Sequence, residues 1–294
     1  MKYTHHSEYL PLKSVYIKSA KNAFISDTHI DAHWEALNYI SAPIYQDSIE
    51  EYTKFQEKLI DEGCEIYHFS EERNVNMDSI YCRDASIATD FGMIICNMGK
   101  SGRANEGSTQ RKEFIKEGIA ILGEITSPGT LEGGDVAWLD QNTLAVGHGY
   151  RTNEEGIAQL KKMLEPKGIT IIIAELPHYK GPSDVFHLMS ILSPIDKDLA
   201  VVYSPLMPVK FRNELIRRGL QLVEVPEEEF DSMGCNVLAI SPRKCIMVAG
   251  NPKTKQALLN AGCETHIYEG EHISVKGGGG PTCLTRPLLR QLTF

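Results

Sequence analysis

Five short apolar segments, the last four of them at nearly regular intervals, most constrain how this chain can fold. Each is about five residues long and rich in the β-branched and apolar side chains typical of buried strands. They are residues 14–18 (SVYIK), 93–97 (MIICN), 144–148 (LAVGH), 199–203 (LAVVY) and 245–249 (CIMVA). The last four are centred on residues 95, 146, 201 and 247, so 51, 55 and 46 residues separate them. A period near 50 residues indicates repeated modules.

Stretches with helical periodicity alternate with these strands. They cover residues 49–61, 110–122, 153–164, 207–220 and 253–261. Strand and helix alternation predicts an α/β fold. Because no Ser/Gly-rich linker or charge block interrupts the pattern, we expect residues 1–294 to form a single domain of five modules. A doubly wound α/β sheet would show the same alternation, and the periodicity leaves it open.

The charge balance excludes some partners. The chain has 30 Lys and Arg against 39 Asp and Glu, a net charge of -9, which disfavours nucleic acid and anionic membranes and suits a small cationic substrate. Seven cysteines without a C-x-x-C pair fit reduced thiols, so we expect a cytoplasmic protein. No apolar run approaches the roughly 18 residues of a membrane span.

One cysteine lies in an unusual setting. Residues 277–287 read GGGGPTCLTRP, which places Cys283 beside four consecutive glycines. The spacing lacks the features of a phosphate-binding loop, whereas an exposed thiol near backbone amides can act as a nucleophile. The other six cysteines are expected to be small buried side chains.

Other polar residues could assist such a nucleophile. His187 interrupts an apolar, β-like stretch, residues 185–192 (VFHLMSIL), either as a core histidine bonded to backbone or as a proton-transfer group. Glu132 and Asp135 flank two glycines in LEGGDV, and Asp84 follows Arg83 in YCRDAS. Each carboxylate could simply form a turn or a surface ion pair. Two carboxylates facing one pocket would instead bind a planar cation such as guanidinium.

Together these motifs resemble a known superfamily. R-D at 83–84, E-G-G-D at 132–135, R-T-N at 151–153, F-H-L at 186–188 and G-G-G-P-x-C-L-T at 278–285 occur in the order found in guanidino-group-modifying enzymes. That superfamily includes arginine deiminases, amidinotransferases and dimethylarginine dimethylaminohydrolases. The resemblance implies a five-bladed α/β propeller, or pentein, of ββαβ-type modules.

The resemblance also implies residue roles. Cys283 would be the nucleophile and His187 the general acid and base. Glu132 would hold the substrate guanidinium together with the histidine, and Asp84 would accept hydrogen bonds from its nitrogens. This chemistry needs no metal or cofactor.

Two arginines would bind the other end of the substrate. Arg103 and Arg151 match family residues that grip the substrate carboxylate, while Asp135 is expected only to shape the turn behind Glu132.

Deiminases and amidinotransferases typically have an acidic residue two places after the catalytic histidine, where this chain has Met189. Met189 therefore favours an alkylated guanidinium, which needs fewer acceptors.

We therefore predict a hydrolase of N-methylated arginine, most similar to the dimethylarginine dimethylaminohydrolases, that releases citrulline and a methylamine. The alternatives are an arginine deiminase or dihydrolase, an amidinotransferase, and a protein of this fold that binds guanidines without catalysis. The expected partner is a small guanidino compound, and a homodimer is possible.

Overall fold

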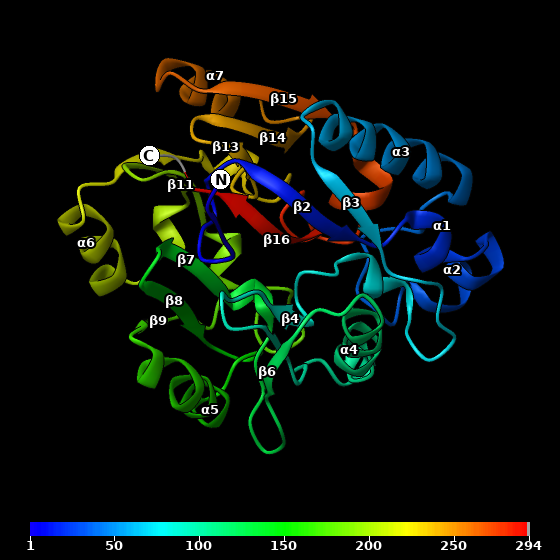
Figure 1. The fold of residues 1–294 in the computed structure, drawn as a ribbon. Helices are drawn as coiled ribbons and strands as arrows, with labels where there is room; N and C mark the ends of the chain where they lie inside the picture. The colour runs from blue at the N-terminus through cyan, green and yellow to red at the C-terminus, as the bar shows by residue number, and fades with distance from the viewer. Residues whose placement is uncertain (293–294) are drawn as a thin grey trace.

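Each of the five predicted strands is an inner strand of a separate small sheet, and we call it the middle strand of that sheet. The computed structural model describes residues 1–292, and its sheets are arranged in a ring (Figure 1). The middle strands are β2 (Leu12–Ile17), β5 (Met93–Ile95), β8 (Thr143–His148), β11 (Leu199–Val202) and β14 (Lys244–Val248). The period near 50 residues is therefore the period of the sheets.

Four sheets have the same ββαβ order. The first strand pairs antiparallel with the middle strand, a helix follows, and the last strand pairs parallel with the middle strand. The first strand, helix and last strand of each are β4 (Ser86–Ile87), α4 (Glu106–Lys116) and β6 (Ile121–Glu124); β7 (Val136–Asp140), α5 (Glu154–Leu164) and β9 (Thr170–Glu175); β10 (Leu192–Asp196), α6 (Val209–Arg217) and β12 (Gln221–Glu224); and β13 (Leu238–Ser241), α7 (Pro252–Asn260) and β15 (Glu264–Tyr268).

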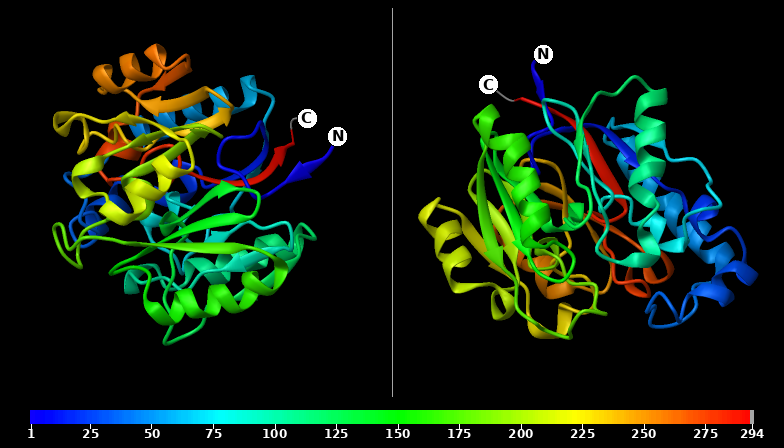
Figure 2. Two further views of the ribbon diagram at one scale, coloured as in Figure 1. Left: turned by 90° about the vertical axis from the view of Figure 1, so that its left-hand side faces the viewer. Right: turned by 90° about the horizontal axis from the view of Figure 1, so that it is seen from below.

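The fifth sheet combines both ends of the described chain. β16 (Thr285–Gln291) pairs antiparallel with β2, and β2 pairs parallel with β3 (Glu65–His68) after α3 (Tyr45–Asp61). The short β1 (Tyr3–Thr4) adds to the other edge of β16. Figure 2 shows the blue and red ends of the chain running beside each other. Two further helices, α1 (Ala20–Phe24) and α2 (Asp27–His33), lie between β2 and α3 in the sequence.

This arrangement is the predicted five-bladed α/β propeller. The helices α3 to α7 lie on the outside of the ring (Figure 1). The alternative of one doubly wound sheet is wrong, because the largest sheet in residues 1–292 has four strands. None of the helices in this range is long and apolar enough to cross a membrane.

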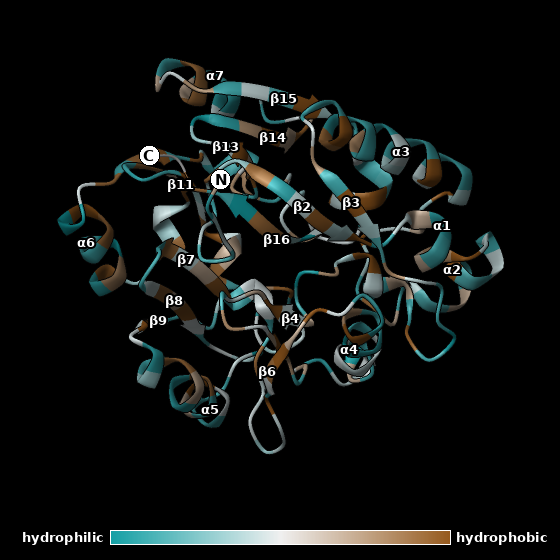
Figure 3. Ribbon diagram, in the orientation of Figure 1, coloured by the Kyte–Doolittle hydropathy of each residue, from teal (hydrophilic) through white to brown (hydrophobic). Residues whose placement is uncertain are grey.

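The outer helices attach by one apolar face. On α3, Tyr52, Phe55 and Leu59 are buried while charged side chains face outward, which Figure 3 shows as alternating colours along the helix.

Several predicted helix boundaries were wrong. The helices expected from residues 49 and 110 begin four residues earlier, at Tyr45 and Glu106. The helix expected over residues 110–122 also ends early, at Lys116, because Gly118 adopts a positive φ of 70° and the next residues turn into β6.

Candidate active site

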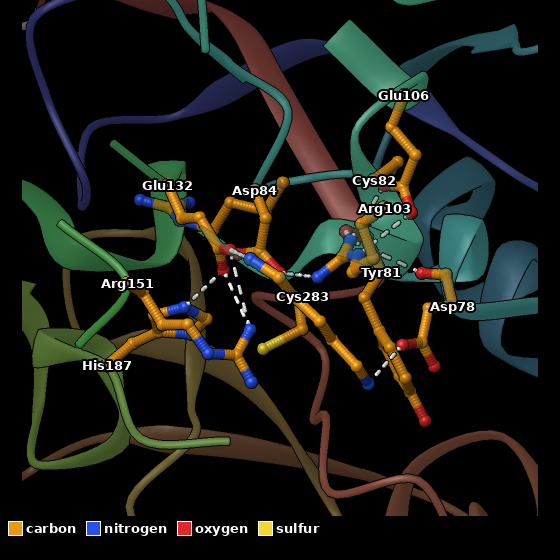
Figure 4. A network of polar contacts seen from close by, with 12 residues as sticks. Asp78, Tyr81, Cys82, Asp84, Arg103, Glu106, Glu132, Arg151, His187 and Cys283 are labelled. Carbon is orange, nitrogen blue, oxygen red and sulfur yellow. Dashed lines mark hydrogen bonds and ion pairs between the residues drawn. The ribbon is translucent and has the colours of Figure 1, made fainter. Parts of the chain in front are cut away.

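A cavity of about 280 Å³ opens among the loops that connect the blades. Five of the six predicted site residues contribute to its wall, namely Cys283, His187, Asp84, Arg103 and Arg151. They are spread between positions 84 and 283 of the sequence and are brought together by closure of the ring. Figure 4 shows Cys283 between two groups of side chains, with Glu132, His187 and Arg151 on one side and Arg103 and Tyr81 on the other.

Cys283 lies just before β16 and is the only partly exposed cysteine of the seven, since the other six are buried as predicted. Its Sγ accepts a hydrogen bond of 3.2 Å from Nδ2 of Asn236. Burial and the nearby negative charge of Asp84 raise the pKa of the Cys283 thiol. Near neutral pH the thiol is therefore neutral in the free protein, and it ionises more readily once a cation binds beside Asp84.

The glycine run serves packing around this cysteine. A Cβ on Gly280 would lie 2.6 Å from the side chain of Asn236. Glycine at this position lets the chain pass directly against the residue that bonds the sulfur.

His187 and Glu132 form a buried, charged pair. A ring nitrogen of His187, Nε2, lies 2.7 Å from Oε2 of Glu132, and Glu132 is fully buried behind the cavity wall. Arg151 Nη1 lies 3.2 Å from the same oxygen, and the amide of Lys100 donates to the other oxygen at 3.0 Å. Glu132 therefore contacts the histidine and an arginine, one layer behind the space that a substrate would enter.

The apolar residues around His187 suggested a strand, but His187 does not lie in one. It precedes a short 3-10 helix, Leu188–Ser190, and its amide donates to Oγ of Ser190 at 3.1 Å. β10 begins only at Leu192. The apolar side chains Leu188 and Met189 are buried, which explains the misleading pattern.

The charges around His187 determine its protonation. Burial lowers its pKa, but Asp84, Asp135 and Glu132 together raise that pKa to about 9. For Glu132 burial acts in the opposite direction and raises the pKa of the carboxyl. The hydrogen bond to His187 outweighs burial and holds the pKa of Glu132 below its usual range. Near neutral pH the pair is an imidazolium and a carboxylate, so His187 is ready to donate a proton.

Asp84 presents one free carboxylate oxygen. Its Oδ2 accepts a 2.5 Å bond from Nη1 of Arg103, whereas Oδ1 is buried and has no hydrogen-bond partner among residues 1–292. A Cβ on Gly134 would lie 2.6 Å from this Oδ1 and 2.7 Å from Nδ1 of His187, so the glycine of the E-G-G-D motif leaves room for both groups. A buried unpaired acceptor costs free energy unless a ligand donor satisfies it.

Arg103 is already committed to protein partners. Its Nε and Nη2 each bond Glu106 at 2.8 Å, Nη1 bonds Asp84, and Nη2 also donates to the carbonyl of Tyr81 at 2.9 Å. Four of its five N–H groups are thus occupied, and one N–H of Nη1 has no partner among residues 1–292. These bonds make Arg103 the residue that orients Asp84. That it also grips a substrate carboxylate stays a prediction, with one N–H available for it.

Arg151 is less fully engaged. Its Nη1 contacts Glu132, and its Nη2 donates to the carbonyl of Asp184 at 3.1 Å. Because this guanidinium lines the cavity, its remaining N–H groups are available to a ligand.

Asp135 does not line the cavity. It accepts bonds from the hydroxyl of Thr152 at 2.7 Å and from the amide of Leu188 at 3.0 Å, and so fixes the segment that carries His187.

Asn236 is a site residue that the sequence did not reveal. It lies between α6 and α7, outside any of the five motifs, and its Oδ1 accepts bonds from both the amide and the hydroxyl of Thr282. The same side chain thus holds the residue before Cys283 and donates to the sulfur. No local pattern around Asn236 points to this role.

The site favours an organic cation over a metal ion. Ligand-type atoms of Asp84, Glu132 and His187 lie within 4.8 Å of one another, a spacing that could hold a metal. However, Glu132 already contacts His187 and Arg151, and Asp84 contacts Arg103. These cationic neighbours oppose a divalent ion, while the open Oδ1 of Asp84 suits the N–H of a planar cation.

Comparisons with known proteins agree with this geometry. The sequence matches the family described as N,N dimethylarginine dimethylhydrolase, eukaryotic, over residues 21–290. It is 30% identical to a dimethylarginine dimethylaminohydrolase of Streptomyces coelicolor over 213 residues, covering 71% of this chain and 73% of that protein.

Solved structures show the same fold. A Pseudomonas aeruginosa dimethylarginine dimethylaminohydrolase complexed with citrulline superposes with a TM-score of 0.75 at 20% identity, over 95% of this chain and all of that one. An amidinotransferase of saxitoxin biosynthesis from Microseira wollei gives a TM-score of 0.78 at 16% identity, over 98% and 97% of the two chains. With its motifs, fold and site in agreement, the chain belongs to the dimethylarginine dimethylaminohydrolase family, within the guanidino-group-modifying superfamily, and is a hydrolase of C–N bonds in linear amidines.

Proposed function

We propose that the protein hydrolyses N-methylated arginine, above all asymmetric dimethylarginine, to citrulline and a methylamine. The observation that supports this most is the combination in one cavity of a thiol, an imidazolium and a buried carboxylate oxygen that has no hydrogen-bond partner in the described part of the chain. A guanidinium that donates to Oδ1 of Asp84 satisfies that oxygen and brings its central carbon beside Cys283.

Substrate binding prepares the nucleophile. The cation neutralises the field of Asp84, which otherwise raises the pKa of the Cys283 thiol, and the proton of the thiol leaves to solvent. Asn236 donates a hydrogen bond to the resulting thiolate. The thiolate then attacks the guanidinium carbon of a substrate already held in position.

His187 moves the protons of the reaction. As an imidazolium it protonates the methylated nitrogen, so the C–N bond breaks, the amine departs and a covalent S-alkylthiouronium forms on Cys283. The neutral imidazole then takes a proton from water, which attacks the same carbon. The C–S bond breaks, the thiolate returns, and the ureido product is released.

Two apolar side chains favour a methylated substrate. Met189 and Phe186 both line the cavity beside His187. A dimethylated nitrogen has no N–H to satisfy, so it fits an apolar wall without leaving a buried donor unpaired. An unsubstituted guanidinium has five N–H donors and would need acceptors that these residues cannot provide.

A product-resolved assay tests the proposal. Purified protein is incubated separately with arginine, monomethylarginine and asymmetric dimethylarginine, and citrulline, ornithine, ammonia and methylamines are quantified by mass spectrometry. We expect citrulline and dimethylamine in equal amounts and little turnover of arginine. Ammonia from arginine would make it a deiminase, and ornithine would make it a dihydrolase.

A further inference from the structure

Lys100 places an ammonium group in the cavity wall. Its Nζ lies 2.7 Å from Oδ2 of Asp78 and 3.1 Å from the carbonyl of Leu37, and the side chain is only 16% exposed. An ammonium has three N–H donors, and these are its two acceptors among residues 1–292. One N–H is left for a group inside the cavity.

The other cations of the wall are less available. Arg103 has one N–H without a protein acceptor, because Glu106, Asp84 and the carbonyl of Tyr81 take the other four. Lys276 has three partners, the carbonyl of Ala42 at 3.2 Å, Nδ1 of His272 at 3.3 Å and Glu271 at 3.8 Å. Lys180 lies at the rim, where its side chain is 55% exposed and pairs with Asp231. Lys100 and Arg151 are therefore shielded from water and keep spare donors, and neither is held by two carboxylates as Arg103 is by Asp84 and Glu106.

The position of Lys100 relative to Glu132 suits an arginine-sized molecule. The backbone amide of Lys100 donates to Glu132, and the ammonium lies one lysine side chain away, beside Asp78. In arginine a tether of four carbons separates the guanidinium from the carboxylate carbon. A substrate guanidinium next to the His187–Glu132 pair can therefore extend its other end along Lys100 to the ammonium.

The spare N–H of Lys100 offers this end of the cavity a donor for an anion. Oδ2 of Asp78 and the carbonyl of Leu37 each accept a hydrogen bond from Lys100 and so hold the ammonium in place. A substrate cation approaching this point would meet a fixed ammonium, whereas a carboxylate would gain a charge-assisted hydrogen bond.

We propose that Lys100, together with Arg151, binds the carboxylate of the guanidino substrate, in the place that the motif comparison gives to Arg103. This inference rests on the proposed guanidino substrate and names the residue that selects its anionic end. Asp78 and the carbonyl of Leu37 act as positioning groups, because they hold the ammonium of Lys100 in place.

Binding measurements test the inference without depending on turnover. In a Cys283→Ser background, calorimetry gives the Kd of monomethylarginine and of N-methylagmatine, its counterpart without the carboxylate. Lys100→Met is expected to weaken binding of monomethylarginine about 10- to 100-fold, as for one charge-assisted hydrogen bond. Binding of N-methylagmatine is expected to change less than about twofold. The control Lys180→Met removes a cavity cation at the rim and is expected to change neither value.

A second variant guards against misfolding. If Lys100→Met leaves Asp78 buried without a partner and destabilises the chain, Lys100→Met with Asp78→Asn removes both charges and is expected to show the same selective loss. Equal losses for both ligands, or no loss for monomethylarginine, would overturn the role of Lys100 and leave the guanidino site intact. Failure of the Lys100-containing protein to bind either ligand would overturn both this inference and the proposed function.

Discussion

Asn236 donates a hydrogen bond from Nδ2 to Sγ of Cys283 across 3.2 Å, while its Oδ1 accepts two bonds from Thr282. One amide side chain therefore fixes the backbone beside the nucleophile and supplies a donor to the sulfur. A donor to the sulfur favours the thiolate over the thiol, against the burial and the Asp84 charge that raise the pKa of Cys283.

Asn236→Asp separates these two functions. Aspartate keeps the acceptor for Thr282 but replaces the donor with negative charge, so we expect the pKa of Cys283 to rise further and the reaction to slow about tenfold or more. The pH dependence of Cys283 alkylation by a haloacetamidine measures this directly. Asn236→Ala serves as the comparison, since it removes both functions, and an unchanged alkylation profile in the aspartate variant would contradict the role.

Cys283→Ser is expected to reduce turnover by about 10³-fold or more, because a serine hydroxyl ionises far less readily than a thiol. Binding of the guanidino substrate should be largely retained, since Asp84 and His187 are unchanged. Rates and calorimetric Kd values for the same preparation test both parts. Substantial residual turnover would exclude Cys283 as the nucleophile.

The pH profile reports His187. Its pKa of about 9 lies above the ordinary value, so the imidazolium persists at neutral pH and is lost as the pH rises through about 9. We expect kcat to fall in that range. For the same reason, protonated His187 should contribute fully to the free energy of unfolding below about pH 6.5, and this contribution should be lost as the pH rises through about 9. Histidine NMR titration of the resting protein checks the value. In Glu132→Gln the pKa of His187 should be lower by about one unit or more. An unchanged pKa would show that Glu132 does not raise it.

Arg103→Met tests whether this arginine is structural. Removing it leaves the carboxyls of Glu106 and Asp84 buried without their partner, and we expect a loss of about 3–5 kcal/mol in the free energy of unfolding. Burial already raises the pKa of Glu106 to about 7 although Arg103 opposes it. The matched control is Arg111→Met, which breaks the exposed pair with Glu124 and should cost less than about 1 kcal/mol. Urea unfolding compares the two, and similar losses would refute a structural role.

Met189 should influence which nitrogen leaves. Met189→Asp adds an acceptor to the apolar wall, so we expect the ratio of kcat/KM for arginine to that for asymmetric dimethylarginine to rise about tenfold or more. Met189→Leu keeps the wall apolar and is expected to preserve the original ratio. Competition between the two substrates in one reaction measures the ratio, and equal behaviour of the two variants would remove Met189 from substrate choice.

The sequence predicted the middle strand of every blade because these strands are apolar on both faces. The outer strand β12 escaped prediction for the opposite reason: most of its residues are exposed or half-buried, and its polar residues resemble a loop. The predicted helix over residues 110–122 joined α4 to β6 because periodicity alone did not weigh the turn at Gly118.

Motifs identified the residues of the site but not their contacts. Arg103 lies three residues before Glu106, a helical spacing at which ion pairs form, and this signal could have assigned it to the protein interior. Asn236 and Lys100 carry no such signal. They reach the cavity only because the ring places distant loops side by side.

Closure of the ring by β16 also has a consequence in time. The strand pairs with β2, near the start of the chain, and Cys283 lies two residues before it. A ribosome therefore adds the nucleophile only after the segments that carry Asp84 and His187 have been synthesised. A growing chain has the carboxylate and the histidine but lacks the Cys283 thiol, so the reaction can begin only when synthesis has passed residue 283 and β16 can close the ring.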